Sequence, residues 1–304
     1  MLKILKILTT ILFFVLVVVA ATHSLNSINQ DIGRHLKSGQ IIWETGRVYK
    51  TNLFSFTEPD HPFINHHWLS EVVFFLLNGL IGLKGLIVFK VGVIVATFAL
   101  LWLAVRRTAS HIPFLAAGIP ALLVFSSRTD VRPEMFSYLF LAYFLFAIFR
   151  AKYSNEARWS RSPEAIEDPR YRKAISGLYA LPIIQIFWTN MHIYFALGPL
   201  LLLLYLTDRL AHGSAPVPAK SQRVSLFTKT PFVIFVLTSL ATLFNPNFIR
   251  GALAPLTILR NYGYSIVENQ NIFFLTDYGI QLRDIYLFEI SLIVLIISFV
   301  IALR

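Results

Sequence analysis

Residues 150–173 read RAKYSNEARWSRSPEAIEDPRYRK, and this stretch decides how the rest of the chain is arranged. It is polar, lies between two apolar runs and carries seven basic residues. These are Arg150, Lys152, Arg158, Arg161, Arg170, Arg172 and Lys173. Loops rich in Lys and Arg stay on the cytoplasmic side of a membrane, so a membrane protein with this stretch should hold it in the cytoplasm.

Apolar runs fill most of the remaining sequence. Of 304 residues, 56% are hydrophobic and 14% are charged, whereas a soluble domain carries about 25% charged residues. Because irregular backbone cannot face lipid, each long run predicts a helix. The runs cover residues 4–21, 69–83, 86–105, 112–126, 134–149, 175–188, 193–207, 231–244 and 285–303. An ordinary soluble globule is therefore excluded.

The first run has two interpretations. Lys3 and Lys6 precede its apolar part at residues 7–19, and the small residues Ala20 and Ala21 end it, as in a cleavable signal peptide. The run is also long enough to cross a bilayer, and a protein with many later spans needs no cleaved signal. We favour an uncleaved first span at residues 4–21.

The run at 69–83 sets the number of spans. If it crossed the membrane, residues 150–173 would lie outside, against the charge rule. If it lies along the outer surface, every basic cluster is cytoplasmic, including Arg106, Arg107 and the 209–229 loop. We therefore predict an all-α, polytopic bundle in which the other eight runs cross, with a cytoplasmic N-terminus. The outer loop then covers residues 22–85 and contains a surface helix at 66–82.

Other classes of protein are disfavoured by the composition. The formal net charge is +11, but many of the basic residues flank apolar runs, which indicates membrane topology instead of nucleic-acid binding. The chain has no cysteine, so disulfides and thiolate chemistry are excluded. It has no Walker loop and no GxGxxG motif. The last run ends at the last residue, which fits either a minimal module or the N-terminal part of a longer protein.

The outer loop is dense in groups that exchange protons. Asp31 and His35 are four residues apart, so on a helix they share one face, with Arg34 beside them. This arrangement suits a general base or a metal ligand, and it equally suits a helix-capping Asp with solvated neighbours. Gly39 and Gly46 bracket a short apolar piece and predict two turns of the chain at the membrane surface.

Two histidines follow in the same loop. His66 and His67 stand between Asn65 and Glu71, and His67 and Glu71 are spaced to share a helical face. Metal binding is one interpretation of this group. Adjacent histidines diverge on a helix, however, and no HExxH spacing occurs, so a preformed zinc site is the less favoured interpretation.

A second charged cluster lies between two spans, in SRTDVRPE at residues 127–134. Its four charged residues are Arg128, Asp130, Arg132 and Glu134. Burying such charges mid-bilayer costs about 2.5–3.5 kcal/mol each, so they should be solvated, paired or functional. Two arginines suit a phosphate ligand, and a salt-bridged loop is the equally weighted alternative.

A third group lies at the next outer helix end. Asn190 and His192 have the chemistry to bind a sugar hydroxyl, and the alternative is that they only cap helix ends. The outer loop 245–283 follows later and contains Glu268. Its length predicts a lid over a site.

The layout and short motifs resemble the GT-C superfamily of polyprenyl-phosphate-dependent glycosyltransferases. Asp31 stands where that superfamily has an essential acid, early in the first outer loop, and DIGRHLKSGQIIWETGRVYKTNLFSF looks like the loop of uncharacterised bacterial members. Asp130 and Glu134 match its second acidic motif. Related sequences tend to have an acid where His67 stands and a Gln where Glu134 stands.

The expected function is transfer of a sugar from a polyprenyl-phosphate donor to an unknown acceptor outside the cytoplasm, at the plasma membrane. Asp31 is the expected catalytic base, with Mg²⁺ or Mn²⁺ at Asp130 and Glu134 as an open option. The expected substrate-binding residues are Arg34, His35, His66, Arg128, Arg132, Asn190, His192 and Glu268. No nucleic-acid partner is expected. The alternatives are a flippase for lipid-linked saccharides, disfavoured because helix interiors hold almost no charge, and a structural envelope subunit.

Overall fold

The computed structural model describes residues 2–22, 31–106, 111–126, 130–156, 175–211, 222–257, 272–277, 279 and 283–302. Within these ranges the chain is mostly helical and has no β-strand, which confirms the all-α prediction. The helices are α1 Leu2–Ala21, α2 Ile32–Thr45, α3 Trp68–Val105, α4 His111–Phe125, α5 Glu134–Glu156, α7 Leu181–Met191, η2 Ile193–Ala196, α8 Leu197–Ala211, α9 Gln222–Ala241, α10 Phe248–Thr257, α11 Ile272–Asp277 and α12 Arg283–Ala302.

Four helical stretches are long and apolar enough to cross a membrane, as expected for a membrane protein. They are Lys3–Ala21, Trp68–Val105, Glu134–Tyr153 and Ile193–Ala211. Three shorter apolar stretches accompany them, at His111–Phe125, Thr230–Ala241 and Ile285–Ser298. Many large apolar side chains on the outside of these helices are exposed, which is typical of surfaces that face lipid.

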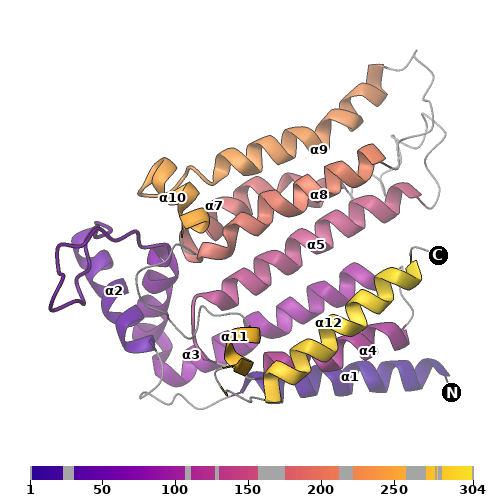
Figure 1. The fold of residues 1–304 in the computed structure, drawn as a ribbon, viewed down its shortest axis with the longest axis horizontal. Helices are drawn as coiled ribbons and strands as arrows, with labels where there is room; N and C mark the ends of the chain where they lie inside the picture. Colours follow the sequence, from indigo (N-terminus) through magenta and orange to yellow (C-terminus); the bar gives the residue numbers. More distant parts are fainter. Residues whose placement is uncertain are drawn as a thin grey trace.

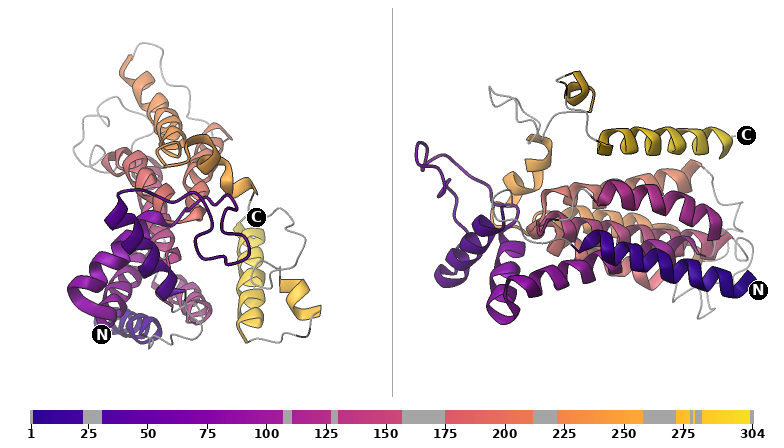
Figure 2. Two further views of the ribbon diagram at one scale, coloured as in Figure 1. Left: turned by 90° about the vertical axis from the view of Figure 1, so that its left-hand side faces the viewer. Right: turned by 90° about the horizontal axis from the view of Figure 1, so that it is seen from below.

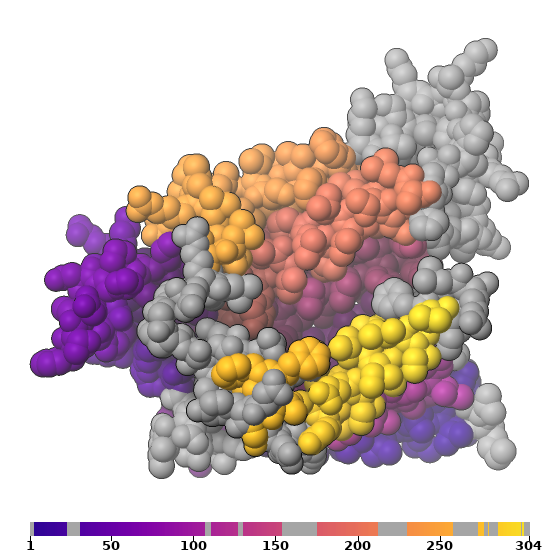
Figure 3. Space-filling model, in the orientation of Figure 1, coloured from indigo at the N-terminus to yellow at the C-terminus, as the bar shows by residue number. Residues whose placement is uncertain are grey.

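The long helices lie side by side in one bundle (Figures 1 and 2). α5 contacts α3 on one side and α7 and α8 on another, while α1 contacts both α3 and α4. Both termini lie at one end of the bundle, and α2 lies at the opposite end, which we call the α2 end (Figure 1). In the space-filling view the α2 end projects beyond the bundle (Figure 3).

A sharp corner divides α3 into two parts. Gly82 has φ 67° and ψ 179°, so it breaks a helix that otherwise runs from Trp68 to Val105. Only glycine adopts this backbone conformation without strain, because at this φ and ψ a Cβ crowds the adjoining main chain. The first part of α3 packs against α2, and the second part runs through the bundle (Figures 1 and 2). The break falls where the sequence placed the end of a surface helix at residue 82.

The expectation of a turn at Gly39 was wrong. α2 is one continuous helix through Gly39, and it ends at Gly46, whose φ of 63° closes the helix with a hydrogen bond to the oxygen of Ile42. Gly39 instead permits close packing, because a methyl group there would overlap the main-chain oxygen of Glu71. The two glycines therefore have different roles, one in packing and one in the turn.

Several helix ends also differ from the predicted runs. The run predicted at 175–188 is helical from residue 175, but a turn at residue 180 divides it: residues 175–179 are helical, and α7 begins at Leu181 with a proline at its start. α9 spans Gln222–Ala241, although the run was predicted at 231–244. Polar residues within a helix obscured these boundaries, because hydropathy identifies the apolar part of a helix and not its ends.

Candidate functional site

Polar side chains from four parts of the chain meet at the α2 end. They come from the start of α2, from residues 65–71 at the start of α3, from residues 130–132 before α5, and from the end of α7. α3, α5 and α7 pack against one another. This packing brings residues 130–132 and the end of α7 next to the start of α3. The candidate site is therefore built by helix packing between segments far apart in the sequence.

Asp31 forms the exposed part of this site. It stands directly before the first residue of α2. Its side chain makes no capping hydrogen bond, so a helix-capping role does not explain the presence of an aspartate here. Its carboxylate is 52% exposed and lies 3.9 Å from the Arg132 guanidinium. Arg132 also lies 3.6 Å from the carboxylate of Asp130. Both distances are longer than a hydrogen bond, so these ion pairs are loose.

Glu71 is the buried centre of the site. One of its oxygens lies 3.0 Å from Nδ1 of His35, and the other accepts a hydrogen bond of 2.6 Å from the Asn65 amide. Arg34 lies 3.9 Å from the same carboxylate. Glu71 and His35 are almost fully buried, so their contact fixes α2 against α3 in an apolar setting.

Three imidazole rings extend from Glu71 towards α7. The ring of His67 lies 5.9 Å from that of His35 and 5.3 Å from that of His192, measured between centroids. Nδ1 of His192 lies 2.8 Å from Oγ of Ser137, which itself accepts a hydrogen bond from the Trp188 indole. These rings form a short row between α2 and the end of α7.

The hydrogen bonds assign the tautomers of the two outer rings. The main-chain N–H of Tyr194 donates to Nδ1 of His192 at 3.5 Å, so this nitrogen is an acceptor and Nε2 carries the hydrogen. Nδ1 of His35 faces a carboxylate, so in the neutral ring Nδ1 donates and Nε2 accepts. Nε2 of His192 is thus a donor, and Nε2 of a neutral His35 is an acceptor.

Burial keeps three histidines of the site neutral at pH 7. It lowers the pKa of His66 to about 4 and the pKa of His192 to about 3, with nearby histidines adding to the shift of His192. The pKa of His67 also lies well below its ordinary value because of burial and of its histidine neighbours. The neutral rings can accept as well as donate hydrogen bonds.

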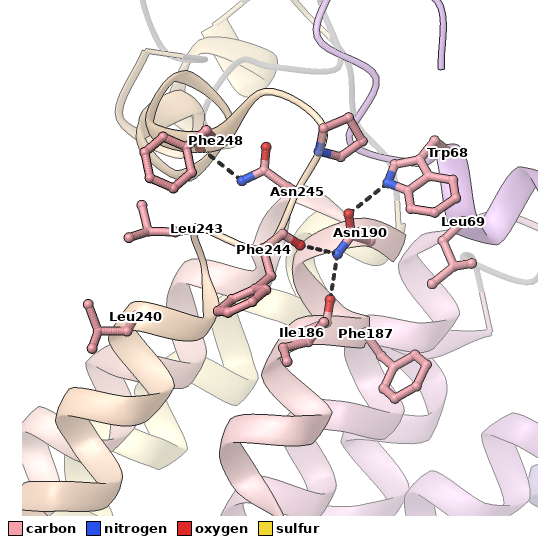
Figure 4. Close-up of a pocket in the computed structure, with 11 residues that line it drawn as sticks. Trp68, Leu69, Ile186, Phe187, Asn190, Leu240, Leu243, Phe244, Asn245 and Phe248 are labelled. Atoms are coloured by element: carbon pink, nitrogen blue, oxygen red, sulfur yellow. Dashed lines mark hydrogen bonds between the residues drawn. The ribbon is translucent and has the colours of Figure 1, made fainter. Parts of the chain in front are cut away.

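Asn190 joins this site to an apolar groove. Its side-chain oxygen accepts a hydrogen bond of 2.7 Å from the Trp68 indole, and its amide donates to the main-chain oxygens of Ile186 and Phe244 (Figure 4). Both of its hydrogens are therefore used within the protein. His192 lies two residues further on and caps η2 through Tyr194, so capping occurs at this helix end as the sequence alternative proposed.

The groove has a volume of about 870 Å³ and lies between α7, α9 and the start of α3 (Figure 4). Its lining is almost entirely apolar, with the side chains of Asn190 and Asn245 among the few polar groups. The lining residues are Trp68, Leu69, Ile186, Phe187, Asn190, Leu240, Leu243, Phe244, Asn245, Pro246 and Phe248. Its chemistry fits a hydrocarbon chain.

The structure brings together most of the predicted site residues. Asp31, Asp130 and Arg132 form one group, and Arg34, His35 and His192 belong to the row around Glu71. Glu134 is the half-buried first residue of α5. Arg128 and Glu268 lie outside the described residues. Within the described residues, no three His, Asp or Glu side chains converge as a metal site.

Sequence reasoning missed two residues of this region and the partners of a third. Glu71 was singled out because its spacing lets it share a helical face with His67, but it contacts His35 and Asn65. Ser137 was not singled out, and neither was Lys90, which is 2% exposed in α3. We expected the helix interiors to hold almost no charge, and Lys90 is an exception to that expectation. It is the only charged residue from Gly85 to Val105, and that isolation was the available signal.

Comparison with known protein families, characterised proteins and solved structures found no match to this chain.

Proposed function

We propose that this protein is a membrane glycosyltransferase of the GT-C type, which transfers a sugar from a polyprenyl-phosphate donor to an acceptor on the non-cytoplasmic side. The observation that carries the proposal is the pair formed by Asp31 and Arg132 at the α2 end of an apolar bundle. A half-exposed carboxylate next to a guanidinium provides a base for a hydroxyl and a cation for a phosphate at the same place.

Each group has a distinct role in this proposal. Asp31 removes the proton of the acceptor hydroxyl, and its 52% exposure leaves it accessible to an acceptor from water. Arg132 holds the donor phosphate, whose negative charge grows as the sugar leaves. Arg128 is proposed to assist it. Because both ion pairs of Arg132 are loose, its donors can turn to a phosphate without breaking a strong contact.

The apolar groove supports a lipid-linked donor. Trp68 lines the groove and directly follows His67, so the groove and the row of imidazoles meet at the start of α3. A hydrocarbon chain in the groove would carry its phosphate end towards the α2 end. His35, His66 and His192 are then placed to bind sugar hydroxyls, as the proposal assigns them.

The charge distribution supports the proposed orientation. Arg150 and Lys152, the first basic residues of the 150–173 stretch, lie in the last turns of α5, and this end of α5 is opposite to α2 in the bundle (Figure 1). By the positive-inside rule that end is cytoplasmic, which puts Asp31 outside the cytoplasm. We propose the plasma membrane as the location.

The test is sugar transfer by the purified protein from a mixed pool of polyprenyl-phosphate sugars. Replacing Asp31 by Asn should lower the rate by about 100-fold or more, the usual contribution of a general base. Asp60→Asn is the matched control, because Asp60 is exposed in the same outer loop. Equal rates for wild type and Asp31→Asn would refute the role of Asp31. Repeating the assay with EDTA tests whether Mg²⁺ or Mn²⁺ acts with Asp130 and Glu134.

A second candidate function is supported by the buried Lys90. Ionisable residues inside membrane helices often belong to transport pathways, so a flippase for lipid-linked saccharides also fits. Liposomes with a fluorescent lipid-linked sugar separate the two candidates. A flippase moves the lipid between leaflets without an acceptor and without cleaving it, whereas a transferase releases polyprenyl phosphate only when the acceptor is present.

A further inference from the structure

Lys90 is a buried charge in a helical segment that is otherwise apolar. Lys90 is 2% exposed, and its neighbours along the same face of α3 include the buried Leu86, Val93 and Ile94. A lysine at such a position is costly in a membrane protein and in general indicates a functional site. The second part of α3 does not need this charge to be a stable helix.

The geometry of α3 directs this side chain towards the α2 end. Side chains on a helix tilt towards its N-terminus, and the second part of α3 begins at the Gly82 corner. Lys90 lies eight residues after Gly82, which is about 12 Å along the helix at 1.5 Å per residue. Its stem extends back over part of that distance. Consistent with this direction, the nearby charge that acts on Lys90 is that of Asp130.

Asp31, Arg132, Asp130 and Lys90 therefore form a series of alternating charges that runs from the surface into the bundle. The side chains of the first three are 52%, 21% and 33% exposed, and Lys90 is buried. Asp130 lies 3.6 Å from Arg132 and also acts electrostatically on Lys90. Nε of Arg132 is buried and makes no hydrogen bond within the described part of the chain, although Oδ2 of Asp130 lies 3.6 Å away. A buried donor held only by such a loose ion pair is the kind of group that a bound anion satisfies.

We propose that Lys90 is the inner one of two cationic groups that hold the phosphate of a lipid-linked ligand, with Arg132 as the outer one. This inference rests on the proposed function for the class of ligand. During transfer, the bond between the sugar carbon and the acceptor oxygen forms, and the bond between that carbon and the phosphate oxygen breaks. The electron pair stays on the phosphate, while the acceptor proton passes to Asp31. The phosphate gains one negative charge, which Lys90 then stabilises.

The experiment measures binding of farnesyl phosphate and of uncharged farnesol to the purified full chain in detergent. Wild type should bind farnesyl phosphate more tightly than farnesol. Lys90→Met should lower the affinity for farnesyl phosphate about tenfold, the loss expected for one charge-assisted hydrogen bond, and leave farnesol binding unchanged. Lys84→Met is the matched control, because Lys84 is exposed on the same helix, and it should bind both ligands like wild type.

A second pair of variants separates phosphate binding from a purely structural role. Lys90→Met removes one of the two cations near Asp130, the other being Arg132, and can harm folding. The double variant with Asp130→Asn removes both charges together, so it is compared with Asp130→Asn alone. If Lys90 binds phosphate, the double variant should still bind farnesyl phosphate about tenfold more weakly than Asp130→Asn. Equal affinities of these two would overturn the inference.

The outcomes also separate this inference from the proposed function. If Lys90 governs farnesyl phosphate binding but no sugar is transferred, the inference stands and the glycosyltransferase proposal fails. If sugar is transferred and Lys90→Met binds farnesyl phosphate like wild type, only the inference fails. Wild type that binds farnesyl phosphate no more tightly than farnesol would also overturn the inference.

Discussion

The carboxylate of Glu71 is fully buried and has both oxygens in use. A carboxylate in such a place is stable only while its partners stay, and its partners need it equally. His35 belongs to α2, whereas Asn65 belongs to the segment before α3. This one side chain therefore holds in place the helix that begins next to Asp31.

Replacing Glu71 by Ala should lower the free energy of unfolding by about 2–4 kcal/mol, because His35 and Asn65 would be left buried without their partner. Thermal unfolding in detergent measures the loss, and hydrogen exchange of α2 should rise with it. Glu58→Ala serves as the control, because Glu58 is exposed and its replacement should change stability by less than about 0.5 kcal/mol. Equal stability of the two variants would contradict the role of Glu71.

The histidines predict how stability depends on pH. The pKa of His192 is about 3 in the folded protein and has its ordinary value of 6.5 when unfolded, so between these values the unfolded state binds the extra proton. Stability is therefore complete above pH 6.5 and falls as the pH falls towards 3, by about 1.4 kcal/mol per pH unit for this residue.

Unfolding midpoints between pH 7.5 and 4.5 test this dependence. His192→Gln should have a flatter pH dependence than wild type, because the replaced side chain takes up no proton. His61→Gln is the control, since His61 is exposed and lies away from the row of rings. An unchanged pH dependence in His192→Gln would show that His192 is not held neutral by burial.

At the level of residues, the sequence identified the exposed part of the candidate site better than its buried part. Asp31, Asp130 and Arg132 were predictable because charges at the ends of apolar runs are unusual. The contacts of Glu71 with α2, and of Ser137 with His192, were not predictable. They depend on which helix faces meet, and hydrophobic periodicity does not encode that when a helix is apolar all round.

Among the helices, the corner in α3 depends on one residue, Gly82. Gly82→Ala should destabilise the protein by about 1–3 kcal/mol, because a Cβ is strained at its φ of 67° and ψ of 179°. Gly79→Ala is the matched control on the same helix, where the added methyl has no neighbour within 4 Å. It should leave stability unchanged or raise it by up to about 1 kcal/mol. Thermal unfolding of both variants measures the difference, and equal effects would contradict the strained corner.

The positions of the helices followed from the sequence more readily than their shapes. Apolar runs predicted where the helices lie, because burial in lipid demands both apolar side chains and satisfied backbone groups. The continuous α2 was missed because Gly39 usually indicates a turn. Its reason is a contact with the main chain of Glu71, 32 residues later, and no local pattern reveals such a contact.

For the whole molecule, the chain offers a clean test of orientation because it has no cysteine. A membrane-impermeant maleimide should label Glu58→Cys in intact cells, since Glu58 is exposed in the loop between α2 and α3, which the proposed orientation places outside. Leu210→Cys, at the far end of α8 where Leu210 is 81% exposed, should be labelled only after permeabilisation. The reverse pattern would overturn the proposed orientation and the placement of Asp31 outside the cytoplasm.

The groove beside α7 and α9 also has a kinetic consequence. Phe187 and Leu240 line it and are about half exposed on the outer surface of the bundle, where a lipid-embedded protein meets hydrocarbon. A lipid donor reaching the groove from there never enters water, so its search is lateral diffusion in two dimensions. The enzyme proposed here would then respond to the mole fraction of donor within the bilayer, and its rate would be insensitive to the volume of buffer around the membrane.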